Sequence, residues 1–246
     1  MRIALVSDIH GNLPALQAVV RDLDRRGVDA VINLGDALSG PLLPQATAEF
    51  LMAQDWEHLA GNHERQVLTL GPGRWGPEDA FTHGQLAPEV LAWIATLQPA
   101  RRYSRDLYLC HATPASDLDY LLDTVEPSGA VRAATAAELQ ARLGTIDAAV
   151  IACGHTHHPR VLRTAAGQLL VNPGSVGLQA YEWDRPHRHR IQNGAPDARY
   201  AIVEREHGQW QAQLLAVPYD HESMALLAQA RGMADWVHAL RTGYME

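Results

Sequence analysis

Five short segments of the sequence combine histidine with carboxylate or amide side chains, the residue types that bind metal ions. These segments are Asp8-Ile9-His10, Gly35-Asp36, Gly61-Asn62-His63-Glu64, Cys110-His111 and Gly154-His155-Thr156-His157. Each of them follows a short apolar run. Mixed imidazole, carboxylate and amide ligands suit Mn, Fe, Zn or Ni better than Ca or Mg, which prefer oxygen ligands alone. The pattern therefore predicts a site for transition-metal ions.

Each segment also has an ordinary structural explanation when it is taken alone. Asp36 is of a type common in turns and helix N-caps, and His111 fits a hydrogen-bonded histidine of the core. Five such segments together are harder to explain in this way. Each places a polar side chain at the end of an apolar strand, where burial without a partner costs several kcal/mol. Metal ions would supply partners for all of these side chains at once.

The elements that precede these segments predict how the side chains converge. Residues 2–7 and 30–34 are apolar enough for buried strands, and apolar residues recur at helical spacing over 13–26. A strand, a helix and a strand in this order predict parallel pairing of the two strands. Asp8 and His10 are two residues apart, so on an extended chain they point to the same side. Parallel sheets place their sites at the carboxyl ends of the strands.

The remaining elements follow from periodicity, caps and turn residues. Helices are predicted over 44–54, 87–97 and from the capping box Thr135–Glu138 to Leu143, and a helical segment with a break near Gly232 over 220–241. Strands are predicted over 55–60, 100–104, 106–110, 148–153, 159–164, 168–172, 199–205 and 209–217, and loops over 71–77 and 184–198. The polar segment 184–198 is expected to be a mobile, solvated insertion. The alternative is that it covers the site or binds anions of the substrate. No linker or repeat divides the chain, which predicts one domain.

The composition narrows the classes of partner. The formal net charge is -8 and every basic residue is arginine, which disfavours a groove for bulk nucleic acid. The two cysteines, Cys110 and Cys153, are expected to be small packing residues in a reducing compartment. No apolar run approaches the ~18–20 residues of a membrane helix, and the N-terminus lacks the apolar core of a secretion signal. We therefore expect a cytoplasmic protein that binds no membrane.

The five segments resemble, in order and in spacing, the motifs of the calcineurin-like metallophosphoesterases, in the small bacterial and archaeal phosphodiesterase branch. The segment Asn172-Pro173-Gly174-Ser175-Val176-Gly177 is also similar to that branch, and the resemblance extends over residues 1–218. It implies a four-layer α/β/β/α sandwich, in which two mixed β-sheets pack face to face with helices outside. We expect a single domain of this kind over residues 1–246, including the C-terminal helical segment.

The resemblance also implies a set of ligands for two divalent metal ions, of which Mn is favoured. The first ion would be held by Asp8, His10, Asp36 and His157, and the second by Asp36, Asn62, His111 and His155. A hydroxide between the two ions would attack phosphorus in line with the leaving oxygen. His63 occupies the family's position for a histidine that is not a ligand. It would protonate the leaving oxygen or stabilise the phosphoryl oxygens, with Asp8 or Asp36 as the carboxylate that keeps it charged; a hydrogen bond to a ligand is the structural alternative.

Four other residues are weaker candidates. Asn12 is a candidate for substrate binding, although capping of the helix over 13–26 is the favoured role. Arg65 is a candidate for binding a phosphate, and a solvated surface position fits it equally well. Trp75 and Trp183 are suited to stacking on a base, although packing is the simpler role. The protein phosphatase branch has an arginine shortly after Gly-Asp, whereas Gly35-Asp36 is followed by Ala37-Leu38-Ser39-Gly40-Pro41. This difference argues against a dedicated protein phosphatase.

The expected function is metal-dependent hydrolysis of a small phosphoester, with a phosphodiester favoured and nucleotides among the candidate substrates. Two alternatives use the same site, namely hydrolysis of a dinucleoside polyphosphate and hydrolysis of a phosphomonoester. A third alternative is a catalytically silent scaffold that binds a protein partner on the same fold. The sequence leaves the substrate, the native metals and the oligomeric state open.

Overall fold

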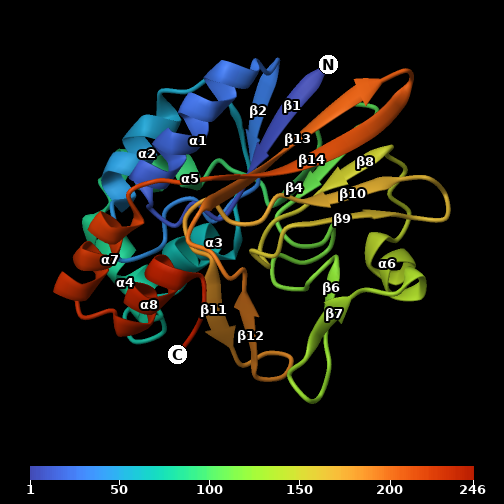
Figure 1. Ribbon diagram of the computed structural model, residues 1–246. Coiled ribbons are helices and arrows are strands. Elements are labelled where there is room, and N and C mark those ends of the chain that lie inside the picture. Colours follow the sequence, from blue (N-terminus) through green and yellow to red (C-terminus); the bar gives the residue numbers. More distant parts are fainter.

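Two five-stranded β-sheets pack against each other in the computed structural model, which describes residues 1–246 (Figure 1). The first sheet has the order β14-β13-β1-β2-β3. Its strands are β1 (Arg2–Val6), β2 (Ala30–Asn33), β3 (Glu57–His58), β13 (Ala198–Glu206) and β14 (Gln209–Val217). Strands β1, β2 and β3 are parallel, and β13 runs antiparallel to both β1 and β14. The parallel pairing of the first two strands is therefore confirmed.

The second sheet has the order β4-β5-β8-β10-β9. It contains β4 (Ala100–Arg102), β5 (Leu107–Cys110), β8 (Val150–Ala152), β9 (Arg160–Arg163) and β10 (Leu169–Asn172). Strands β5, β8 and β10 are parallel, and the edge strands β4 and β9 are antiparallel to their neighbours. Both sheets are thus mixed, as the resemblance implied, and each has a parallel centre.

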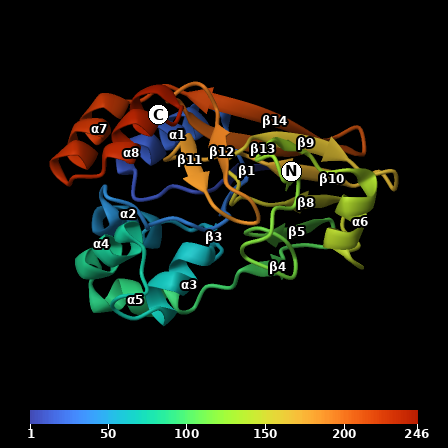
Figure 2. The same ribbon diagram turned by 90° about the horizontal axis from the view of Figure 1, so that it is seen from below.

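Three apolar layers hold the sandwich together. Alternate residues of both sheets, such as Leu5, Leu109 and Val150, form the buried layer between the sheets. Helices α1 (Leu13–Arg26), α2 (Pro44–Met52) and α5 (Pro88–Ile94) cover the outer face of the first sheet. Helix α6 (Ala136–Leu143) covers the outer face of the second sheet, on the opposite side of the molecule (Figures 1 and 2). The four-layer arrangement is therefore confirmed.

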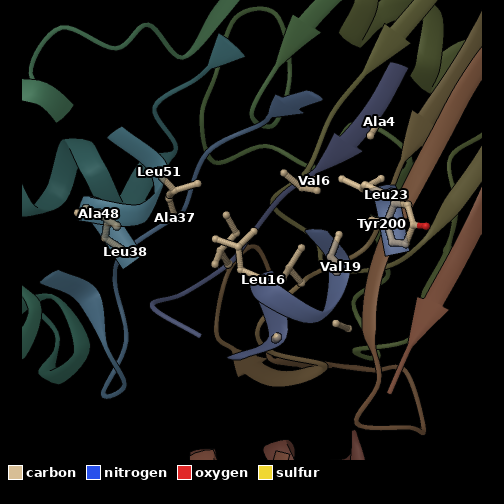
Figure 3. Packing of buried hydrophobic residues seen from close by; sticks show 14 of the residues in the cluster. Ala4, Val6, Leu16, Val19, Leu23, Ala37, Leu38, Ala48, Leu51 and Tyr200 are labelled. Carbon is tan, nitrogen blue, oxygen red and sulfur yellow. The ribbon is translucent and has the colours of Figure 1, made fainter. Parts of the chain in front are cut away.

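Helix α1 shows how the sequence forms one of these layers. Asn12 caps its first turn by accepting the N–H of Ala15, and Gly27 ends it with a φ of 66°. Leu16, Val19 and Leu23 lie on its buried face, and Figure 3 shows Leu23 beside Tyr200 of β13. Full burial of each such aliphatic side chain contributes roughly 1.5–3 kcal/mol.

The structure adds elements that the sequence did not predict. These are α3 (Asn62–Thr69), α4 (Pro77–Gln85) and the hairpin of β6 (Asp123–Val125) and β7 (Val131–Ala133). The prediction of a mobile loop over 184–198 is wrong, because β12 (His189–Gln192) pairs with β11 (Ala180–Trp183) in a second hairpin. His189 and Ile191 are buried while Arg190 is exposed, so alternation within β12 was hidden by the polar residues around it. Both hairpins extend from the lower end of the sandwich in Figure 1.

Most of the other predicted elements are confirmed, including the break in the C-terminal helical segment. That segment forms α7 (His221–Ala230) and α8 (Ala234–Thr242), with Gly232 between them. The strand predicted over 55–60 is reduced to the two residues of β3. No helix of the protein combines the length and the apolar character that crossing a membrane requires.

Candidate metal centre

The five polar segments meet where the parallel strands of both sheets end. Asp8 and His10 follow β1, and Asp36 follows β2. His111 follows β5, and the segment with His155 follows β8 of the second sheet. The carboxyl ends of parallel strands lie at one edge of a sheet, and the two sheets are packed with these edges together. The sandwich therefore brings ligands from residues 8 to 157 into one place.

The backbone of the ligand segments adopts a conformation that is rare in residues other than glycine. Positive φ angles between 51° and 66° occur at Asp8, His10, Asp36, His155 and His157. Such angles cost free energy in residues other than glycine and persist at functional sites, where the surrounding structure enforces them. Hydrogen bonds between the two loops of the first sheet provide this enforcement, because the N–H groups of Asp8 and His10 donate to the carbonyls of Gly35 and Asp36.

Two glycines of the motifs allow the segments to approach closely. A Cβ atom at Gly61 would lie 2.1 Å from Oδ1 of Asp36, and one at Gly154 would lie 1.9 Å from Oγ of Ser7. Any side chain at either position would push a ligand segment away from its neighbour. The glycines are therefore needed for space.

The first cluster of candidate ligands is Asp8, His10 and His157, whose ligand atoms all lie within 4.8 Å of one another. Nδ1 of His10 donates to the carbonyl of Ser39 at 2.6 Å, and Nδ1 of His157 donates to the carbonyl of Leu178 at 2.8 Å. These hydrogen bonds place the proton of each neutral imidazole on Nδ1 and leave Nε2 with a lone pair. The two Nε2 atoms face each other at 3.0 Å.

The second cluster is Asp36, His111 and His155, again with ligand atoms within 4.8 Å of one another. Nδ1 of His111 donates to the carbonyl of Leu34, so its Nε2 is the nitrogen that faces the cluster. That atom lies 3.1 Å from Oδ2 of Asp36 and 3.2 Å from Oδ1 of Asn62. His155 faces the cluster with Nδ1 and not with Nε2, because its Nε2 donates to the backbone carbonyl of Leu118.

The first cluster thus brings electron-pair donors together with no hydrogen between them. Oδ1 of Asp8 is buried without any hydrogen-bond partner and lies 3.5 Å from Nε2 of His157. Facing lone pairs repel unless a cation lies among them, and a divalent metal ion satisfies several at once. The donor set of nitrogen and carboxylate oxygen fits a transition-metal ion. The residues present therefore fit metal ions in both clusters.

The charges of the site support the same conclusion. Burial lowers the pKa of His10 to about 3 and that of His155 to about 4, so both are neutral and able to bind metal. Burial also opposes protonation of His111, but the charge of Asp36 outweighs it and raises the pKa of His111 to about 9. Burial would favour the neutral form of Asp36, yet the nearby histidines hold its pKa well below the usual range. The carboxylates therefore attract a cation to this site.

His63 stands beside the clusters without belonging to either. Its side chain is 26% exposed, and its Nδ1 donates to Asp79 at 2.7 Å. Its ring is 5.4 Å from that of His10. Burial opposes protonation, but the charge of Asp36 and the hydrogen bond and charge of Asp79 raise the pKa of His63 to about 10. His63 is thus an exposed, charged proton donor next to the candidate ligands.

The amino-acid sequence matches a known family over most of its length. Residues 1–191 match the model of the calcineurin-like phosphoesterase superfamily domain. The chain belongs to this superfamily. The expectation drawn from the five motifs is therefore confirmed at the level of the family.

Solved structures with the same fold include other members of this superfamily. A metallophosphoesterase from Sphaerobacter thermophilus is 25% identical to this chain, and the two match over 99% of each chain with a TM-score of 0.76. A hypothetical protein from Pyrococcus horikoshii shares the fold with a TM-score of 0.73 at 14% identity, over 100% of this chain and 99% of that one. An uncharacterized protein from Methanocaldococcus jannaschii is 38% identical over 66 residues, which is 27% of this chain and 27% of the relative.

Two carboxylates of this chain have roles that sequence reasoning missed. Asp79 of α4, and neither Asp8 nor Asp36, accepts the hydrogen bond of the His63 side chain, although the charge of Asp36 also raises the pKa of His63. Asp79 also accepts the hydroxyl of Ser39 at 2.5 Å. Glu64 is buried and accepts the backbone N–H groups of residues 36, 37 and 61. Glu64 follows Gly61 by three residues, which is the spacing of a capping box, and this spacing could have indicated such a role. Asp79 lies in a helix that the sequence did not predict, so it carried no signal.

The structure places the weaker candidates in structural roles. Asn12 caps α1, and its two amide hydrogens donate to the carbonyl of Gly177 and the hydroxyl of Tyr219, so no donor is left for a substrate. Arg65 makes a bidentate pair with Asp117 at 2.5 and 3.0 Å. The predictions of substrate contacts at Asn12 and Arg65 therefore have no support in the geometry.

The two loop tryptophans differ in their surroundings. Trp75 packs against His83 and donates its indole N–H to a backbone carbonyl, in line with a packing role. Trp183 lies at the end of β11 and is 43% exposed. Cys110 and Cys153 are buried and free, as expected for packing residues.

Proposed function

We propose that this protein hydrolyses a small phosphodiester at a centre of two divalent transition-metal ions, with Mn favoured. One observation carries the proposal. Two neighbouring clusters each direct two imidazole nitrogens and a carboxylate to one place, and in the first of them two Nε2 atoms face each other at 3.0 Å without an intervening hydrogen. Asp8, His10 and His157 would hold the first ion, and Asp36, His111 and His155 would hold the second. Asn62 would join the second set, and Asp36 would be shared by both.

The protein groups around the centre have separate tasks. Such ions, when bound, polarise the phosphoryl oxygens and make a nucleophile available at neutral pH. The backbone carbonyls behind the ligand histidines hold each imidazole in the tautomer that binds metal. His63 holds a proton on Nε2, because Nδ1 is committed to Asp79. From that atom it would donate to the leaving oxygen as the bond to phosphorus breaks.

The charge of the site supports a diester over a monoester. No arginine pairs with Asp8 or Asp36, and Arg65 at the edge of the site is neutralised by Asp117. Besides metal ions, the protonated side chain of His63 is thus the positive charge that a substrate would meet in this site. A phosphodiester carries one negative charge, whereas a monoester carries up to two and needs more compensation.

The test is hydrolysis of bis(p-nitrophenyl) phosphate and of p-nitrophenyl phosphate by metal-free protein to which Mn²⁺ is added back. We expect Mn-dependent turnover with the diester preferred. Asp36→Asn should abolish it, and Glu89→Gln on the exposed face of α5 is the matched control. Activity of metal-free protein, or full activity of Asp36→Asn, would contradict the two-metal assignment.

Other outcomes would select between the remaining functions. Preference for the monoester would make the protein a phosphomonoesterase. If metal binds and neither compound reacts, a panel of cyclic nucleotides, dinucleotides and dinucleoside polyphosphates comes next. Failure of the whole panel would favour the silent scaffold.

A further inference from the structure

Helices α7 and α8, here called the C-terminal helical pair, lie outside the residues that match the superfamily model. They pack beside the loops that follow β1 and β2 and against β11, on the side of the molecule away from α6 (Figures 1 and 2). Their buried residues form one apolar cluster with residues of those loops. The pair therefore belongs to the surroundings of the metal centre.

The first cluster depends on two carbonyls that belong to segments packed against this pair. Ser39 and Leu178 accept the Nδ1 hydrogens of His10 and His157 and so fix both rings. Leu178 itself is packed in the apolar cluster of the helical pair, together with Leu42. The segment after Ser39 is also tied to the pair by Arg231, whose guanidinium donates to the carbonyls of Pro41 and Leu42.

Trp236 of α8 contacts the same loop and the ligand directly. Its ring lies so close to Gly40 that a Cβ atom there would be 2.7 Å from the indole. The centre of its ring is 5.9 Å from that of His10 in an edge-to-face arrangement. Its indole N–H points to Glu78 at 3.3 Å, and 6% of the residue is exposed. Trp236 thus packs against both Gly40 and His10.

The end of α8 reaches the other histidine of the first cluster. The carbonyl of Gly243 accepts the N–H of Gly194 at 3.1 Å. The neighbouring Asn193 donates its side-chain amide to the carbonyl of His157 at 2.8 Å. Both histidines of the first cluster are therefore connected to the helical pair within one or two contacts.

The second cluster has different supports. His111 donates to the carbonyl of Leu34 at the end of β2, and His155 donates to the carbonyl of Leu118. The loop with Leu118 is held by the pair of Arg65 and Asp117. None of these contacts involves α7 or α8.

We propose that the C-terminal helical pair, chiefly through Trp236, sets the metal affinity of the first cluster and leaves that of the second cluster unchanged. Trp236 is then a positioning residue for His10 and for the loop that orients it. The inference rests on the proposed two-metal function. It adds that the two metal sites are supported by separate parts of the chain and respond separately to substitution.

The test is calorimetric titration of metal-free full-length protein with Mn²⁺. Wild-type protein should bind two equivalents. Trp236→Ala should weaken one of them by about 10–100-fold, the range found when the partners that orient ligands are removed. In a His155→Ala background, which disables the second cluster, Trp236→Ala should weaken the remaining site by that factor. In a His157→Ala background, which disables the first cluster, it should change nothing.

Two further variants separate positioning from loss of stability. Leu240→Ala removes a buried side chain one turn further along α8 in the same cluster, so it lowers stability without touching Gly40 or His10. It should bind both ions as wild type does. Trp236→Phe keeps an aromatic ring against Gly40 and should restore most of the affinity.

Gly40→Ala tests the contact if Trp236→Ala does not fold. The new methyl group would meet the carbonyl of His10 at 2.6 Å and the indole of Trp236, so it should weaken the first site as well. Equal weakening of both sites by Trp236→Ala, or two unchanged sites, would overturn the inference. A wild-type protein that binds no Mn²⁺ would instead overturn the proposed function.

Discussion

The pair of His63 and Asp79 illustrates what single residues contribute to the site. Asp79 is 3% exposed and accepts hydrogen bonds from both His63 and Ser39. Ser39 in turn provides the carbonyl for His10, so the proton donor and a candidate ligand share one support. Asp79 fixes the orientation of the His63 imidazole and leaves Nε2 as the atom that faces a substrate.

Replacement of Asp79 should therefore lower turnover without removing metal. We expect Asp79→Asn to reduce kcat about 10–100-fold, the effect of losing an orienting partner. His63→Asn removes the proton donor itself and should reduce kcat about 10²–10⁴-fold. Steady-state kinetics and the metal content measured by mass spectrometry check this. Loss of metal in either variant would show that the pair holds the centre together instead.

At the scale of elements, Glu64 joins α3 to the loop after β2. Its carboxylate accepts three backbone N–H groups, two from that loop and one from Gly61 at the start of its own helix. The three bonds measure 2.9, 2.9 and 2.7 Å. They hold Asp36 against the helix that carries Asn62 and His63. Glu64 thus sets the position of one element relative to another.

Glu64→Ala should leave these three buried N–H groups without acceptors. Each unsatisfied group costs about 1–3 kcal/mol, so we expect a loss of at least about 3 kcal/mol in the free energy of unfolding. Urea denaturation measures the loss, with Glu89→Ala on the exposed face of α5 as the control. A change below about 1 kcal/mol would mean that water replaces the carboxylate.

Helix α1 is tied to β13 by another carboxylate, Asp22, which accepts the hydroxyl of Tyr200 and the guanidinium groups of Arg25 and Arg26. Burial opposes ionisation, yet these hydrogen bonds lower the pKa of Asp22 to about 2 from an ordinary value of 3.8. The folded state therefore binds this proton less readily than the unfolded state. The contribution of Asp22 to stability is present above pH 3.8 and is lost as the pH falls to about 2.

Asp22→Asn should consequently cost about 2 kcal/mol at neutral pH, the equivalent of the shift in pKa. The difference in unfolding free energy between wild type and variant should shrink as the pH falls from 4 toward 2. Chemical denaturation at several pH values tests this, with Asp24→Asn on the exposed side of the same helix as the control. A difference that is independent of pH would exclude the ionised carboxylate as its cause.

At the scale of the whole molecule, the metal centre joins the two sheets. Asp8, His10 and Asp36 follow strands of the first sheet, whereas His111, His155 and His157 follow strands of the second. An ion bound in either cluster would therefore link the carboxyl ends of both sheets. Such an ion binds the folded chain and not the unfolded one, so it stabilises the fold by mass action.

Addition of Mn²⁺ to metal-free protein should raise Tm, and chelation should reverse the change. A free Mn²⁺ concentration of 100 times Kd should raise the free energy of unfolding by about 2.7 kcal/mol for each site. The increase should become smaller as the pH falls below about 9, because a metal ion must displace the proton of His111. Thermal denaturation followed by circular dichroism checks this, and Asp36→Asn should show a smaller increase. A Tm that is indifferent to Mn²⁺ would contradict a centre between the sheets.

The sequence by itself determined the ligand types and their grouping by strand. Each ligand segment, from Asp8-Ile9-His10 and Gly35-Asp36 onward, follows an apolar run. Local patterns of this kind depend only on residues that are neighbours in the sequence. Helix α1 and the two long C-terminal strands were predictable for the same reason. The arrangement of the two sheets came from the resemblance of these motifs to a family.

Only the tertiary structure decided which groups support the ligands. Asp79, Trp236 and the carbonyls of Ser39 and Leu178 lie many residues along the chain from the histidines they contact. Their contacts depend on how loops pack, and no periodicity or spacing in the sequence records them. The hairpin of β11 and β12 was missed because its buried alternation is only four residues long and stands among charged residues. Ligand chemistry is a property of residue type, whereas orientation is a property of the packed chain.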